Sequence, residues 1–216
     1  PLPHAAGILG HALGLPLDPV WPAWEGTILL HVRLPRILVG MCVGGGLGLC
    51  GSALQGLFRN PLADPAILGV SSGASLGAVI ALYLGLAVYT IWALPVLACL
   101  GAGLTAFVVS AIASRRDHTP IGTLLLAGVA MSSLMTALTS FVLSLALANY
   151  NIGSQIVLWM LGGLDGRTWD HVKLVAPAMC IGAAFILAYA PYLDVLLLGA
   201  LHATSVCVHG PTLLLP

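Results

Sequence analysis

The stretch that decides the fold is RLPRILVGMCVGGGLGLCGSALQGLFRNPLADPAILGVSSGASLG, residues 33–77. No residue between Arg36 and Arg59 carries a formal charge, so residues 37–58 can cross a bilayer, which takes about 20 apolar residues. Two glycine series with a period of four lie in this stretch: Gly40, Gly44 and Gly48, then Gly69, Gly73 and Gly77. Such spacing clears one helical stripe of side chains and lets two helix backbones approach closely in lipid. We therefore predict a tightly packed hairpin of two transmembrane helices.

The connector inside this hairpin is RNPLADP, residues 59–65, which holds the only charged residues between positions 37 and 114. Pro61 and Pro65 fix φ and stop helix propagation. Asn60 and Asp64 are residues suited to capping the neighbouring helix ends. The connector is therefore predicted to be a polar turn, and no catalytic chemistry is visible in it.

Composition places the whole chain in a membrane. Of its 216 residues, 59% are hydrophobic and only 6% are charged, whereas a soluble domain has about 25% charged residues. Seven basic residues balance seven acidic ones, which gives no reason to expect nucleic acid as a partner. The five cysteines include no CxxC pair and favour small buried apolar residues over metal ligands or disulfides. We predict no cofactor, no metal site and no catalytic residue.

Charged residues delimit five predicted spans. They are residues 37–58, 66–86, 91–113, 121–146 and 174–193, and an apolar loop re-enters after the fourth. Residues 1–32 are broken by proline and carry two interfacial tryptophans, so we place them outside the hydrocarbon. Basic residues number four on one side and three on the other, so their count leaves the orientation undecided. The predicted class is an all-α, polytopic transmembrane bundle of about five spans.

Arg33 and Arg36 flank a Leu-Pro pair directly before the first span. They could reach the lipid headgroups and anchor the helix end. They could also dock carboxylates of a partner, because a guanidinium binds a carboxylate in a bidentate geometry. Position alone favours the interfacial anchor over the docking site.

The fourth span carries a stripe of hydroxyl groups at Ser132, Thr136, Ser140 and Ser144. A spacing of four puts successive residues on nearly the same helical face. Small, uncharged hydroxyls suit the wall of a path for a large polar solute, and they also suit packing between helices. The following segment WMLGGLDG, residues 159–166, is predicted to be an interfacial loop helix.

One motif matches a catalytic string but does not indicate a catalytic site. Residues 69–73 read GVSSG and match the GxSxG string of serine hydrolases, but that motif works at a strand-to-helix elbow with a histidine base nearby. Here it lies in a predicted transmembrane helix, and no histidine lies within any predicted span. We interpret Ser71 and Ser72 as packing residues.

These pieces, in this order, resemble the FecCD-type (BtuC-like) permeases of type II ABC importers, which take up siderophore-iron, haem or vitamin B12. The matching strings are RLPR at 33–36, GSALQGLFRNPLADPAILGVSSGASLGAV at 51–79, LLLAGVAMSS at 124–133, WMLGGLDGRTW at 159–169 and LDVLLLG at 193–199. They cover most of residues 31–199.

The resemblance implies a permease subunit in the cell inner membrane that moves ferric siderophore, haem or a corrinoid. Its partners would be a second copy or a homologous permease, cytoplasmic ATP-binding subunits and a periplasmic solute-binding protein. Arg33 and Arg36 would face the periplasm and dock the binding protein, and the hydroxyl stripe would line the translocation path. Leu198, Gly199 and Ala203 would belong to the region that couples to the ATPase.

The chain departs from the family pattern near its end. Ala200 and Cys207 stand where the family usually has a glutamate and a glycine. We therefore divide the chain into an extramembrane segment 1–32, a permease domain 33–199 and a divergent coupling tail 200–216. A family member has about ten spans, and this chain resembles the N-terminal half. The alternative function is a truncated, non-transporting structural or accessory membrane protein. An ion-coupled carrier is disfavoured because no carboxylate lies within a predicted span.

Overall fold

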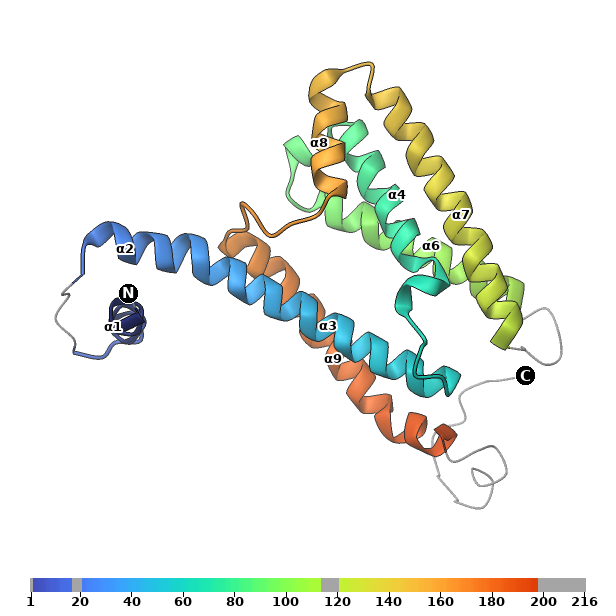
Figure 1. Cartoon of the computed structure of the whole chain (residues 1–216), viewed down its shortest axis with the longest axis horizontal. Helices are drawn as coiled ribbons and strands as arrows, with labels where there is room; N and C mark the ends of the chain where they lie inside the picture. The colour runs from blue at the N-terminus through green and yellow to red at the C-terminus, as the bar shows by residue number, and fades with distance from the viewer. Residues whose placement is uncertain (1, 17–20, 114–120, 198–216) are drawn as a thin grey trace. The chain divides into compact units, whose positions relative to one another are not determined.

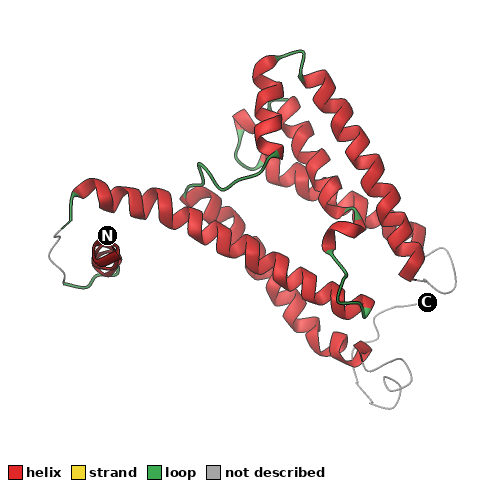
Figure 2. Cartoon of the chain, in the orientation of Figure 1, coloured by secondary structure: helices red, strands yellow, loops and turns green. Residues whose placement is uncertain are grey.

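The computed structural model describes residues 2–16, 21–113 and 121–197, and every regular element in those ranges is a helix (Figures 1 and 2). The chain divides into two compact units, one of residues 1–50 with 163–191 and one of residues 51–162 with 192–216. The predicted all-α class is confirmed. In order, the helices are α1 Leu2–Ala12, α2 Ala23–Ile28, η1 Leu29–Arg33, α3 Leu34–Phe58, η2 Pro65–Leu68, α4 Val70–Tyr83, α5 Leu86–Tyr89, α6 Ala93–Ala113, α7 Ile121–Ala146, α8 Tyr150–Met160 and α9 Trp169–Leu197.

Four helical stretches in the described residues are long and apolar enough to cross a membrane: Ala23–Phe58, Ala93–Ala113, Gly122–Ala146 and Trp169–Pro191. The remaining predicted span, 66–86, is divided. Gly69 adopts a left-handed conformation with φ 75°, which ends η2 and begins α4. Helix α4 has 14 residues and a length of about 21 Å, shorter than the roughly 30 Å hydrocarbon core.

The first long helix begins earlier than predicted. Residues 23–58 form one continuous helix, so the last part of the segment that we expected proline to break is helical. The placement of residues 1–32 outside the hydrocarbon stays a prediction. The prolines at 16, 19 and 22 precede the helix. Pro35 lies inside it and is accommodated by the π-helical turn η1, in which the Leu34 N–H donates to the carbonyl of Leu29. A proline has no N–H of its own, and a single wide turn can absorb that loss.

In the second unit, α4 packs against α6, α7 and α8. A Cβ added at Gly73 would lie 2.5 Å from the carbonyl oxygen of Gly101, and one added at Gly77 would collide with the carbonyl of Leu97. At Gly69 an added Cβ would lie 3.0 Å from the Gly128 carbonyl oxygen. The face formed by Gly69, Gly73 and Gly77 is therefore filled by α6 and α7, and not by the first span as we expected.

The glycines of α3 differ in what lies next to them. An added Cβ at Gly40 would meet the side chain of Leu164 at 3.1 Å, whereas Gly44 and Gly48 face open space among the described residues. Within the described part of this unit nothing fills the stripe at Gly44 and Gly48, and their predicted packing role stays a prediction.

The region after α7 is a helix followed by a glycine loop. Helix α8 buries Ile156 against Val79, Leu82 and Ala146, and the Asn149 side chain caps it by accepting from the Asn151 N–H at 3.1 Å. Residues 161–168 then form a loop in which Gly162, Gly163 and Gly166 have positive φ. The predicted loop helix at 159–166 was therefore wrong, because these glycines adopt conformations that end a helix.

The connector 59–65 uses its polar side chains as local backbone acceptors. The Asp64 carboxylate accepts from the Ala66 N–H at 2.7 Å and caps η2, as predicted. The Asn60 side chain instead accepts from the Leu62 N–H at 2.9 Å within the turn, and Arg59 has φ 50°. This turn ends α3 at Phe58.

Candidate functional site

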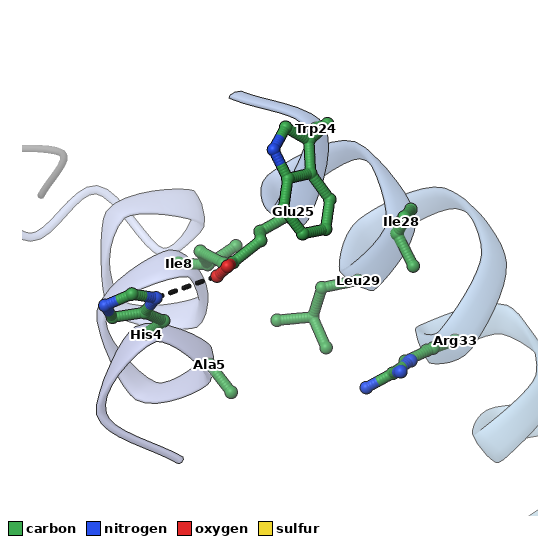
Figure 3. Close-up of a pocket in the computed structure, with 8 residues that line it drawn as sticks. All are labelled: His4, Ala5, Ile8, Trp24, Glu25, Ile28, Leu29 and Arg33. Atoms are coloured by element: carbon green, nitrogen blue, oxygen red, sulfur yellow. Dashed lines mark hydrogen bonds and ion pairs between the residues drawn. The ribbon is translucent and has the colours of Figure 1, made fainter. Parts of the chain in front are cut away.

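Arg33 lies at a pocket of about 320 Å³ in the first unit. The pocket is lined from α1 and from the start of the first long helix, by His4, Ala5, Ile8, Trp24, Glu25, Ile28, Leu29 and Arg33 (Figure 3). His4 Nδ1 lies 2.8 Å from Glu25 Oε2, so this histidine engages the acidic side chain. The guanidinium of Arg33 extends toward the same space (Figure 3). Among the described residues, no carboxylate lies within ion-pair distance of Arg33.

Arg36 differs from Arg33 in that it already has an acidic partner. One of its terminal nitrogens lies 2.7 Å from Asp165 Oδ1, in the loop that precedes α9. The Arg36 side chain is 42% exposed and that of Asp165 92% exposed, so this ion pair is in contact with solvent and contributes little to stability. The two predicted docking arginines are therefore not equivalent.

A second contact, directly after this loop, fixes the start of α9 to the first long helix. The indole nitrogen of Trp169 donates to the carbonyl oxygen of Leu30 at 2.9 Å. In the π-helical register, the donor to Leu30 would be residue 35, which is a proline without an N–H. Trp169 thus satisfies a carbonyl that Pro35 leaves without a backbone donor. Sequence reasoning missed this pairing and the Asp165 partner of Arg36.

The four residues of the hydroxyl stripe on α7 differ in their exposure. Thr136, Ser140 and Ser144 are exposed. Ser132 is half-buried, and its hydroxyl lies close to Gly69 at the start of α4. The neighbouring hydroxyls of Ser133 and Thr139 donate to carbonyls of the preceding turn, at 3.0 and 2.8 Å. Three stripe residues therefore face away from the core of this unit.

The remaining sequence candidates add no further site. Ser71 and Ser72 lie in the first turn of the helix α4, not at a strand-to-helix elbow. No group of three or more metal-ligating side chains lies together in the described part of the chain. Leu198, Gly199 and Ala203, and the divergent positions Ala200 and Cys207, lie outside the described residues.

Comparison with known proteins decides the family. Residues 9–212 match the model of the FecCD transport family. The chain belongs to the FecCD family. The resemblance inferred from the sequence is therefore confirmed, and so is a multi-pass membrane protein with apolar spanning helices.

Several curated relatives of this FecCD chain are named as permeases of import systems. The cobalamin import system permease protein BtuC of Halobacterium salinarum is 44% identical over 191 residues, which are 87% of this chain and 50% of the relative. The Fe(3+) dicitrate transport system permease protein FecD of Escherichia coli is 37% identical over 184 residues, covering 85% of this chain and 56% of the relative. The chain spans about half the length of the curated relatives it matches.

The fold also matches a solved structure. An ABC transporter assigned to the metal-chelate type, in an inward-facing conformation, superposes with a TM-score of 0.76 at 26% identity. The match covers 94% of this chain and 65% of the other. The fold of this FecCD chain is thus found in part of a longer transporter chain.

Proposed function

We propose that this chain is the N-terminal transmembrane part of an ABC importer permease, which moves a metal chelate across the cell inner membrane. The single observation that carries the proposal is the 44% identity, over 87% of this chain, to a permease named for cobalamin import. The identity to the permease named for ferric dicitrate is 37%. On the strength of this order we propose a corrinoid as the first candidate cargo and a ferric siderophore as the second.

The proposed partners follow from the same family. ATP hydrolysis would occur in separate cytoplasmic subunits, so this chain would convert their cycle into alternating access without catalytic residues of its own. A second permease copy would complete the path, and a periplasmic binding protein would deliver the cargo. Leu198, Gly199 and Ala203 would contribute to the contact with the ATPase.

The proposal is tested by uptake in the native host. We expect deletion of the gene to abolish energy-dependent uptake of radiolabelled cobalamin, and the intact gene to restore it. Labelled ferrichrome, assayed in parallel, distinguishes a siderophore permease from a corrinoid one. Unchanged uptake of every chelate would contradict transport and favour the accessory membrane protein.

A second prediction concerns the translocation path, which we propose is lined by Ser132, Thr136, Ser140 and Ser144. We expect Ser140→Trp to remove most of the uptake, because Ser140 is exposed and a bulky ring there would narrow the path without disturbing the core of this unit. The measurement is cargo uptake normalised to the amount of permease in the membrane.

The matched control is Leu138→Trp on the same helix. Leu138 is also exposed, at 40%, and two residues along a helix turn the side chain by roughly 200°. This variant should keep most of the uptake. Equal loss in both variants would indicate that α7 tolerates no bulk on either face and would remove the evidence for a path along the hydroxyl stripe.

A further inference from the structure

A second pocket of the first unit combines apolar walls with a cationic rim. It has a volume of about 390 Å³ and lies between α3, the loop before α9 and the start of α9. Its lining residues are Val39, Val43, Gly163, Leu164, Arg167, His171 and Val175. We propose that this pocket binds an anionic phospholipid, with its phosphate at Arg167 and His171 and the beginning of an acyl chain against the valines. The inference rests on the membrane location of the chain and not on the proposed cargo.

The walls are those of a site for hydrocarbon. Val39 and Val43 lie one helical turn apart on α3, within the uncharged stretch that begins after Arg36. Leu164 and Val175 face them from the loop and from α9. A pocket with this lining accommodates methylene groups, which a free inorganic anion does not have.

The rim carries the positive charge of Arg167. Burial and Arg167 lower the pKa of His171, and Asp170 opposes them, but each of the two nearby carboxylates also has another cation at ion-pair distance. Asp165 is engaged by Arg36 at 2.7 Å, and Asp170 by Lys173 at 3.5 Å. Arg167 is a half-buried residue, and the one hydrogen bond of its guanidinium in the described structure is a long one, 3.5 Å, to the Gly163 carbonyl. Arg167 is therefore the cation available to an incoming phosphate, which a guanidinium binds in a bidentate geometry.

His171 adds a directed donor. Its Nδ1 accepts from the Thr168 N–H at 3.2 Å. The neutral ring therefore carries its proton on Nε2, which remains a donor for a phosphate oxygen. A neutral histidine held in this tautomer can donate a hydrogen bond to the phosphate without carrying a positive charge.

The rim also lies where lipid phosphates are found. Trp169 begins α9 and is held to Leu30 through its indole N–H. Tryptophan is enriched at the headgroup level of bilayers, and the apolar spans of α3 and α9 continue away from this end. An anionic lipid lying along the two helices would therefore bring its phosphate to Arg167 and its chain to the valines.

The experiment is lipid titration of the purified full chain, followed by native mass spectrometry. Phosphatidylglycerol and phosphatidylcholine with identical acyl chains are compared. We expect phosphatidylglycerol to bind about fivefold more tightly, the preference that one basic side chain near a headgroup supplies. Arg167→Gln with His171→Gln should remove this preference, while Arg33→Gln, which removes an equal charge outside the pocket, should keep it.

A further variant separates loss of binding from loss of folding. Val43→Phe keeps both rim side chains and fills the apolar part, so it should weaken phosphatidylglycerol binding even if the double variant does not fold. Equal affinity for the two lipids in the unaltered chain would overturn the proposal. It would equally be overturned by an equal effect of Arg33→Gln, by unchanged binding to Val43→Phe, or by competition from inorganic phosphate at the same concentration as the lipid.

Discussion

We expect Gly101→Ala to lower the free energy of unfolding by about 3 kcal/mol, at the upper end of the range typical for overpacking a core. The reason is the crossing of α4 and α6. A Cβ at Gly101 would collide with the carbonyl oxygen of Gly73 and would lie 3.0 Å from its carbonyl carbon. Both groups belong to helix backbone, so no side-chain rotation relieves the collision and the two helices must separate. Reversible unfolding in mixed micelles with increasing denaturing detergent measures the loss.

The matched control lies two residues away on the same helix. Gly103 is exposed, and nothing lies within 4 Å of a Cβ added there. We expect Gly103→Ala to be neutral or to stabilise by up to about 1 kcal/mol, because alanine has the higher helix propensity. If Gly101→Ala were as neutral or stabilising as Gly103→Ala, helix propensity alone would decide the effect, and the backbone contact between α4 and α6 would be contradicted.

The helices that could be predicted from the sequence are those whose ends are bounded by charged or polar residues. Uncharged stretches bounded by polar residues placed a span at 121–146, and α7 has those bounds. The span predicted at 91–113 corresponds to α6, Ala93–Ala113. These predictions succeed because charge exclusion from hydrocarbon is a property of each segment alone and needs no knowledge of its neighbours.

The partner of a helix face could not be predicted in the same way. The glycine series at Gly69, Gly73 and Gly77 indicates a close approach, but it does not say which helix approaches. Its partner α6 meets Gly73 and Gly77 through Leu97, Gly101 and Thr105. These residues also repeat at a period of four, but only one of them is a glycine, so the contact face of α6 does not stand out as a glycine series in the sequence. We expected the first span to fill the glycine face because it is adjacent in sequence, but in the structure other helices pack there.

Only part of the candidate site could be predicted, because its partners lie far apart in the sequence. Arg33 and Arg36 stand out in the sequence because they precede an uncharged span. Asp165, the partner of Arg36, lies 129 positions after it in the sequence. The residues around Asp165 do not indicate a partner on α3. The Trp169 contact with Leu30 depends on a π turn created by Pro35, and a helical pattern does not reveal such a turn.

The docking role predicted for Arg33 and Arg36, which we retain as a proposal, leads to a second large expected effect. We expect Arg33→Glu with Arg36→Glu, placed in the complete permease, to weaken association with the periplasmic binding protein at least roughly a hundredfold, because opposing like charges costs several kcal/mol. Membrane insertion should be unaffected, since both side chains precede the uncharged stretch 37–58. Binding of the purified binding protein to permease in nanodiscs is the measurement.

Two further variants separate docking from general charge. Lys173→Glu reverses a cation that is 76% exposed and paired with Asp170, and it should leave association nearly unchanged. Asp165→Asn releases Arg36 from its ion pair and should strengthen association if Arg36 takes a carboxylate of the partner. No effect of Asp165→Asn, together with a full loss in Arg33→Glu alone, would assign docking to Arg33 and leave Arg36 to hold the loop before α9. Unchanged association in the double variant would return both arginines to the role of interfacial anchors.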